Sequence, residues 1–137
     1  MMKNNHGHIV NVLSVAALVS IPFLVTYCSS KFGALGLHKG FTQELLALGK
    51  DGIKTTCLCP YFVSTPLVKN VESRIIPILK PEAVAKRLMD GILCNQKKIV
   101  MPSPVSMFSL VEIILPERAL VALHEILSIK LDVKKQE

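Results

Sequence analysis

The feature that most constrains the fold is a run of 22 residues, positions 9–30, without a charged side chain. A run of this length could span a membrane as a helix, and Lys3 precedes it as a basic residue precedes a signal anchor. Pro22 would break a continuous helix, and the first part of the run is rich in β-branched residues. We therefore interpret the run as a buried strand over 8–13 followed by the start of a helix, with a membrane or signal segment as the alternative.

Beyond this run, short β-branched segments alternate with longer segments of helical pattern. We expect a helix over 27–48, a strand over 53–59, a helix over 81–94, a strand over 98–101 and two helices over 107–131. Gly49 and Gly52 mark the turn after the first helix, and Pro60 ends the next strand. Pro81, followed by Glu82, is typical of a helix start. This alternation predicts an α/β fold, part of a doubly wound parallel sheet.

Composition limits the classes of partner. The chain has 137 residues, half of them apolar, and a formal net charge of +6. A chain of this length forms one domain with a moderate core. Its lysines are spread along the sequence and are not interleaved with aromatic residues, so we expect no nucleic-acid binding. A solvated, mildly basic surface is the ordinary interpretation, and attraction to an anionic membrane is the alternative.

The four cysteines, Cys28, Cys57, Cys59 and Cys94, are interpreted as reduced, small hydrophobic residues. The sequence contains no Cys-x-x-Cys motif. We expect Cys57 and Cys59, which share one strand, to point to opposite faces and therefore not to bind a metal together. The sequence therefore predicts neither a metal site nor a disulfide framework.

Three residues suggest acid–base chemistry. Tyr27 and Lys31 are four positions apart in an expected helix, so they share one face a turn apart. A phenol alone is too weak an acid to exchange protons at neutral pH, and a nearby ammonium group stabilises its phenolate. Ser14 ends the first strand, at the carboxyl edge where open α/β sheets bind ligands. Together the three groups could move a proton on or off an alcohol or carbonyl oxygen, although a buried tyrosine often only completes a hydrogen bond.

These residues resemble the short-chain dehydrogenase/reductase family over nearly the whole chain. Segment 8–14 is similar to the family's serine-bearing strand, and segment 27–36 is similar to its Tyr-x-x-x-Lys helix. Segment 57–65 is similar to its later strand and Pro-x-x-Val-x-Thr loop. Within the family, segments 27–32, 52–60 and 115–118 look most like the group of 17-beta-hydroxysteroid dehydrogenases 11 and 13.

The resemblance implies a role for each site residue. Tyr27 would be the catalytic acid or base, Lys31 would assist it and hold the nicotinamide ribose, and Ser14 would be catalytic and orient the substrate. The family's cofactor is NAD or NADP, and the remaining residues implied to contact it are Pro60, Val63 and Thr65.

Other parts of the family pattern do not occur in this sequence. It has no Gly-x-x-x-Gly-x-Gly or Gly-x-Gly-x-x-Gly loop, which would present backbone N–H groups to a dinucleotide's pyrophosphate. Ala17, Leu18 and Tyr61 stand near positions where relatives carry glycine, so we expect their side chains to crowd the ligand. We therefore interpret residues 1–131 as the C-terminal, catalytic half of such a domain and residues 132–137 as a disordered tail, whether a fragment or a truncated isoform.

The resulting hypothesis is an oxidoreductase-family chain for lipophilic alcohols or ketones, such as steroids or retinoids, that is inactive alone. The alternative is a non-catalytic interaction or lipid-droplet surface protein; a small single-pass membrane protein is a third. The resemblance implies the endoplasmic reticulum or lipid droplets as location and a homodimer for a full-length form. We also expect apolar side chains to lie partly uncovered, namely Ile9, Val10, Val12, Phe32, Leu35 and Leu46.

Overall fold

The fold is described from a computed structural model, which describes residues 1–66, 76–107, 111, 114–116 and 118–121. The expected tail at 132–137 and most of the helices expected over 107–131 lie outside the described residues. The elements run in the order η1 (Met2–Asn4), β1 (Gly7–Val12), η2 (Val15–Ala17), α1 (Val25–Ala47), β2 (Ile53–Pro60), α2 (Pro81–Leu93), β3 (Lys98–Met101) and η3 (Ser103–Met107).

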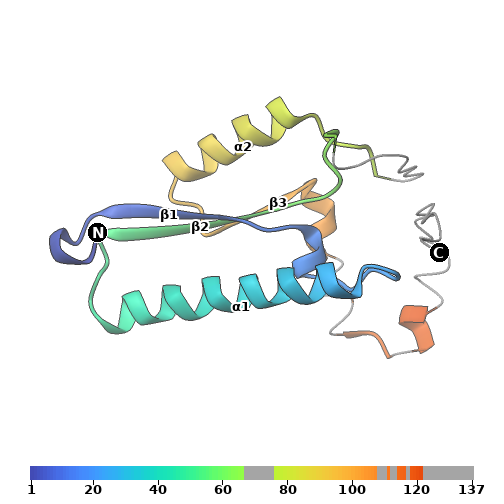
Figure 1. Ribbon diagram of the computed structural model, residues 1–137, viewed down its shortest axis with the longest axis horizontal. Coiled ribbons are helices and arrows are strands. Elements are labelled where there is room, and N and C mark those ends of the chain that lie inside the picture. Colours follow the sequence, from blue (N-terminus) through green and yellow to red (C-terminus); the bar gives the residue numbers. More distant parts are fainter. Residues whose placement is uncertain (67–75, 108–110, 112–113, 117, 122–137) are drawn as a thin grey trace.

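The strands form a parallel sheet in the order β1-β2-β3. The register pairs Gly7 with Ile53 and Val12 with Leu58 across β1 and β2, and Cys57 with Lys98 across β2 and β3. Helix α1 covers one face of the sheet and helix α2 covers the other (Figure 1). The predicted α/β, doubly wound architecture is confirmed, and the boundaries of the helices and strands predicted before residue 102 agree with the structure to within two residues.

Local chemistry explains where the helices begin and end. Pro81 is the first residue of α2, where a backbone N–H would have no acceptor within the helix. Glu82 lies in the first turn, near the positive end of the helix dipole. After α1, Gly49 adopts a left-handed φ of 65° and its N–H donates to the carbonyl of Leu46. Glycine reaches this conformation without strain, so the chain can leave the helix and enter β2.

The core lies on both sides of β2, the central strand, whose residues are all buried except Lys54. On the α1 side, Leu35 packs against Leu13 and Cys59. On the α2 side, Val84 packs against Leu58 and Ile99. A third cluster, at the carboxyl end of the sheet, consists of Val15, Tyr61 and Val105.

The expectation that Cys57 and Cys59 point to opposite faces is wrong. Side chains alternate along a strand, so residues two apart share a face. Both cysteines lie in the core cluster beneath α1, and Cys59 is fully buried. The Cys59 thiol forms a hydrogen bond with Cys57 that lowers the pKa of Cys57, while that bond and burial raise the pKa of Cys59. Even so, the described residues contain no group of three His, Cys, Asp or Glu side chains that could hold a metal.

The apolar side chains expected to lie uncovered are exposed only in part. Val12, Phe32 and Leu46 are exposed, and Ile9 and Val10 are half-buried. Leu35 is instead buried, because its side chain packs against Leu13 and the two cysteines on the face of the sheet. Apolar side chains on both faces of the first strand are therefore only partly covered by the described residues.

The uncharged run at 9–30 divides into β1, η2, a loop and the start of α1. Pro22 lies in the loop, as its effect on a continuous helix predicts. None of the helices in the described ranges has the length and apolar character needed to cross a membrane.

We predict opposite effects of the same substitution at two glycines. A Cβ at Gly52 would run into the backbone carbonyl of Asn5, whose side chain also binds the Gly52 N–H. A Cβ at Gly36, on the outer face of α1, would meet nothing within 4 Å. We expect Gly52→Ala to lower the free energy of unfolding in urea by about 1–3 kcal/mol and Gly36→Ala to raise it by up to about 1 kcal/mol. Equal effects of the two changes would contradict this account of the contact between Asn5 and Gly52.

Candidate functional site

Ser14 lies just beyond β1, where the chain turns into η2. Its backbone is extended, with φ −164°, and its hydroxyl oxygen accepts a hydrogen bond from the N–H of Ala16 at 3.2 Å. The same hydroxyl donates to the carbonyl of Pro60, 3.5 Å away at the end of β2. These two bonds hold Ser14 at the carboxyl edge of the parallel strands, where the sequence predicts it.

Tyr27 and Lys31 lie in the first turns of α1. The Nζ atom of Lys31 lies over the Tyr27 ring, 5.5 Å from the ring centroid, which is the geometry of a cation–π contact. Tyr27 is 40% exposed and Lys31 is half-buried. The phenol is therefore open to a ligand while a cation stays beside it.

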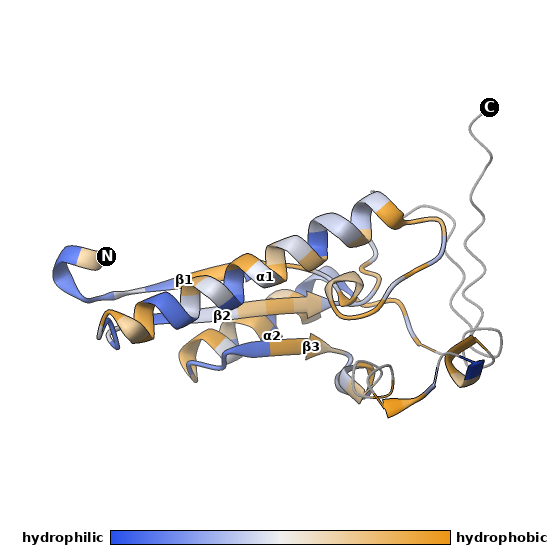
Figure 2. Ribbon diagram, turned by 90° about the horizontal axis from the view of Figure 1, so that it is seen from below, coloured by the Kyte–Doolittle hydropathy of each residue, from blue (hydrophilic) through white to orange (hydrophobic). Residues whose placement is uncertain are grey.

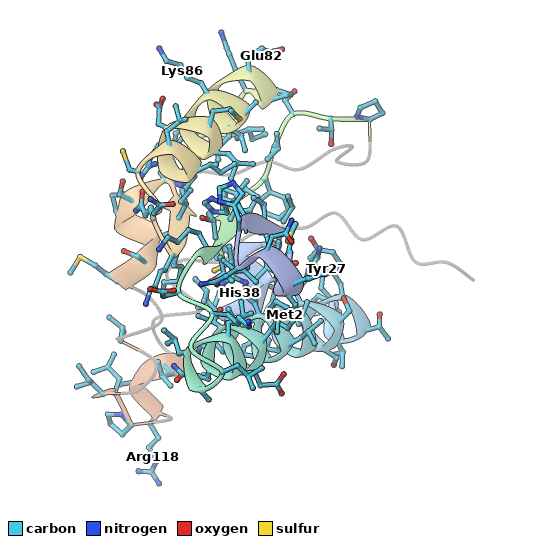
Figure 3. All side chains as sticks on the ribbon, turned by 90° about the vertical axis from the view of Figure 1, so that its left-hand side faces the viewer. Met2, Tyr27, His38, Glu82, Lys86 and Arg118 are labelled. Atoms are coloured by element: carbon cyan, nitrogen blue, oxygen red, sulfur yellow. The ribbon has the colours of Figure 1, made fainter. Side chains whose placement is uncertain are left out.

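The end of α1 that carries Tyr27 lies beside η2, the turn that Ser14 caps (Figure 1). Figure 3 shows Tyr27 on the side of α1 that faces the sheet. The structure therefore places Ser14, Tyr27 and Lys31 at one end of the molecule, although they come from a strand end and a helix. The three side chains bring a hydroxyl, a phenol and an ammonium group to this end of the molecule.

The residues predicted to contact a cofactor follow β2 at the same end. Pro60 is the last residue of β2 and is buried, and Val63 forms an isolated bridge with Leu79. Thr65 is exposed. The structure thus places these residues in the segment that leaves the strand next to β1, at the carboxyl edge that Ser14 occupies.

The three residues expected to crowd a ligand, Ala17, Leu18 and Tyr61, all pack in core clusters, with Leu18 only partly buried. The Tyr61 ring is buried with Val15 and Val105 and packs edge-to-face on Phe62, with ring centroids 4.8 Å apart. Ala17 is fully buried in the cluster beneath α1. Both side chains fill the core.

A shallow groove of about 300 Å³ lies at the same end of the molecule but on another flank of α1. Its lining does not include Ser14, Tyr27 or Lys31; it consists of Ser20, Ile21, Val25, Cys28, Ser29 and Phe32. This groove is therefore separate from the three side chains predicted to be catalytic.

A part-buried polar pair, which sequence reasoning missed, lies between α1 and the sheet. The Nδ1 atom of His38 is 2.9 Å from the Nδ2 atom of Asn11, and His38 is buried. Burial lowers the pKa of His38 below its ordinary value, and a hydrogen bond to the backbone of Lys97 partly opposes this effect. The available signal was Asn11 itself, a polar residue on the buried side of an apolar strand, which needs a partner.

Comparison with known proteins identifies the family. Residues 1–75 match the family described as short chain dehydrogenase. The chain belongs to this family. It is 54% identical over 132 residues to estradiol 17-beta-dehydrogenase 11 of Homo sapiens, and 50% identical over 132 residues to 17-beta-hydroxysteroid dehydrogenase 13 of Homo sapiens. Each match covers 96% of this chain and 44% of the relative, so the chain spans less than half the length of these proteins.

Solved structures show the same fold. A short chain dehydrogenase from Burkholderia cenocepacia J2315, in complex with NADP, is 25% identical with a TM-score of 0.69, and the match covers 93% of this chain and 49% of that one. A short chain dehydrogenase/reductase from Burkholderia phymatum, in complex with NAD, is 20% identical with a TM-score of 0.67 and covers 90% of this chain and 51% of that one. The sheet described above is therefore a Rossmann-like sheet of this family.

The lowered pKa of His38 predicts a dependence of stability on pH. The unfolded chain takes up a proton on this histidine near pH 6.5, whereas folded His38 does so only at lower pH. Between these values the unfolded state binds more protons, so stability present above about pH 6.5 is lost on acidification. We expect the urea midpoint to fall between pH 7.5 and 5.5, and to fall less in His38→Gln. The exposed His6→Gln is the control; a His38→Gln chain with the wild-type fall would contradict the assignment.

Proposed function

We propose that this chain provides the acid–base half of a nicotinamide-dependent oxidoreductase site for lipophilic alcohols or ketones, such as steroids or retinoids. The observation that carries the proposal is the Lys31 ammonium over the Tyr27 ring, at the end of the sheet where Ser14 lies, in a chain of the short-chain dehydrogenase family. The steroid substrate class is supported by the names of relatives about half identical to the chain, estradiol 17-beta-dehydrogenase 11 and 17-beta-hydroxysteroid dehydrogenase 13.

Each side chain has a distinct task in the proposed reaction. The exposed Tyr27 hydroxyl exchanges a proton with the substrate oxygen. The nearby Lys31 ammonium stabilises the phenolate that forms when the proton leaves. Ser14, whose hydroxyl oxygen accepts from Ala16, would turn its proton from the Pro60 carbonyl, 3.5 Å away, to the substrate oxygen and so orient it.

The residues present fit one end of a nicotinamide cofactor. The half-buried Lys31 ammonium and the exposed Tyr27 hydroxyl offer donors for the nicotinamide ribose, and Pro60, Val63 and Thr65 would line its nicotinamide and phosphate side. When bound, the cofactor supplies the hydride acceptor or donor. Solved relatives in complex with NADP and with NAD support either dinucleotide.

The pyrophosphate end has no glycine-rich loop in this sequence, so we propose that the chain alone does not turn over substrate. We expect no oxidation of estradiol or retinol with NAD or NADP by the 137-residue protein. A chimera should be active if it consists of human estradiol 17-beta-dehydrogenase 11 with its 132 matching residues replaced by those of this chain.

In that chimera, Tyr27→Phe removes the proton donor and keeps the ring under Lys31. We expect kcat to fall by at least about 100-fold, in the upper part of the range for loss of a general acid–base group, while cofactor affinity changes little. The Tyr61→Phe chimera is the matched control, because that ring lies in the core. A Tyr27→Phe chimera that keeps most of its rate would remove Tyr27 from the acid–base role.

We propose as a second function that this chain associates with a lipid-droplet or endoplasmic reticulum surface. Parts of the ribbon around the start of α1 are coloured as hydrophobic (Figure 2). Exposed large apolar side chains there include Phe23, 81% exposed, and Val25.

We also propose a homodimer for a full-length form. The exposed Phe32 and Leu46 of α1 support it, because uncovered apolar surface favours association.

We predict that Phe23→Ser weakens this surface association. A buried aromatic side chain contributes about 1.5–3 kcal/mol, so the fraction of protein that floats with neutral phosphatidylcholine droplets should fall several-fold. Leu37→Ser is the matched control, since Leu37 is 71% exposed but lies midway along α1. Equal flotation of wild type and the Phe23→Ser variant would exclude this end of the molecule as the lipid contact.

A further inference from the structure

A part-buried hydrogen bond between side chains joins the strand that leads to Ser14 with the helix that carries Tyr27. In the observed arrangement the amide nitrogen of Asn11 donates to His38 Nδ1 at 2.9 Å, so the imidazole is neutral with its proton on Nε2. His38 is 6% exposed. No buried side-chain nitrogen or oxygen in the described part of the chain lacks a partner, so both groups are satisfied in this arrangement.

The positions of these residues tie the bond to the candidate site. His38 follows Lys31 by seven residues and Tyr27 by eleven, close to two and three helical turns, so the three share one face of α1. Figure 3 shows His38 and Tyr27 on the sheet-facing side of that helix.

The distances along the two elements match. Asn11 precedes Ser14 by three residues, roughly 10 Å along an extended strand, and His38 is roughly 10 Å from Lys31 along the helix. Because α1 runs back along β1 in the opposite direction (Figure 1), both offsets point toward the carboxyl edge of the sheet. When Asn11 and His38 are bonded, Lys31 therefore lies level with Ser14, and Tyr27 lies about one turn further on.

We propose that Asn11 and His38 are positioning residues, which set the longitudinal position of α1 on β1 and so hold Tyr27 and Lys31 at the correct place relative to Ser14. The inference rests on the proposed function, because this position matters for catalysis only if these three residues act on a substrate.

Apolar contacts alone would not set this position. Leu35 and Leu45 bury their side chains under the sheet, but such contacts are non-directional and tolerate small displacements of the helix. A buried hydrogen bond is made at one position only, and a displacement leaves both polar groups unpaired.

Thr42, one turn after His38 on α1, connects this part of the helix to β2. The Thr42 hydroxyl bonds to the His38 carbonyl at 2.7 Å and lies 2.9 Å from the hydroxyl of Thr55 on β2. The His38 turn of α1 is therefore linked to both β1 and β2. Burial also disfavours the protonated imidazole, which keeps Nδ1 free to accept the Asn11 amide at neutral pH.

Kinetics of the chimera test the catalytic consequence. His38→Leu keeps the bulk and removes the bond, and we expect kcat to fall about 10- to 100-fold with little change in KM. His38→Gln can still bond Asn11 and should recover most of the rate. Leu45→Ala is the control: it removes a buried contact on the same helix, so it should lower the unfolding midpoint but leave kcat nearly unchanged. Equal losses of kcat in His38→Leu and Leu45→Ala, or no recovery in His38→Gln, would overturn the proposal.

A second measurement needs no activity. In the isotope-labelled 137-residue chain, His38→Leu should shift the NMR signals of Ser14, Tyr27 and Lys31, which lie well beyond direct contact, whereas Leu45→Ala should shift them much less. Unchanged signals in His38→Leu would overturn the positioning role. An inactive wild-type chimera with the expected NMR shifts would instead count against the proposed function alone.

Discussion

The candidate site depends on how helix α1 packs against the face of the sheet formed by β1 and β2. Ser14 comes from the end of a strand, and Tyr27 with Lys31 comes from the helix that follows, so the proposed chemistry needs both elements. Leu35 and Leu45 supply apolar contact, and the bond between Asn11 and His38 fixes the position of α1 along β1. Stable packing and correct placement of reactive groups are thus achieved by different kinds of residue at one interface.

The same interface explains what this chain provides and what it lacks. The carboxyl edge presents a hydroxyl, a phenol and an ammonium group, which suit proton transfer to an alcohol or carbonyl oxygen. A dinucleotide also needs a cradle for its pyrophosphate, and no glycine-rich loop occurs in the sequence. The exposed Val12 and Phe32, on the outside of β1 and α1, mark apolar surface available for contact with further protein or with lipid.

Much of the fold could be predicted because proline and glycine delimit its elements. Pro60, Pro81 and Gly49 place a strand end, a helix start and a helix end with little ambiguity. Side-chain direction was predicted less well. Cys57 and Cys59 are two residues apart on a strand and therefore share a face, contrary to the prediction. Leu35, predicted to be partly uncovered, packs against the face of the sheet.

The candidate site could be predicted in part, for a related reason. Tyr27 and Lys31 are four residues apart, so local helix geometry is enough to bring them together. The role of Tyr61 depends on which way its ring turns, and its burial against Val15 and Val105 follows from tertiary packing. The pairing of Asn11 with His38 spans 27 residues and depends on the docking of α1, which no local pattern specifies.

A crystal structure of the chimera with NADP and a steroid ketone would test the central claim most directly. The account predicts that the ketone oxygen lies about 3 Å from both the Tyr27 hydroxyl and the Ser14 hydroxyl, within hydrogen-bond reach of each. It also predicts that the Asn11–His38 bond is intact in that complex. A ketone oxygen bound to other groups, with Tyr27 and Ser14 beyond hydrogen-bond distance, would contradict it.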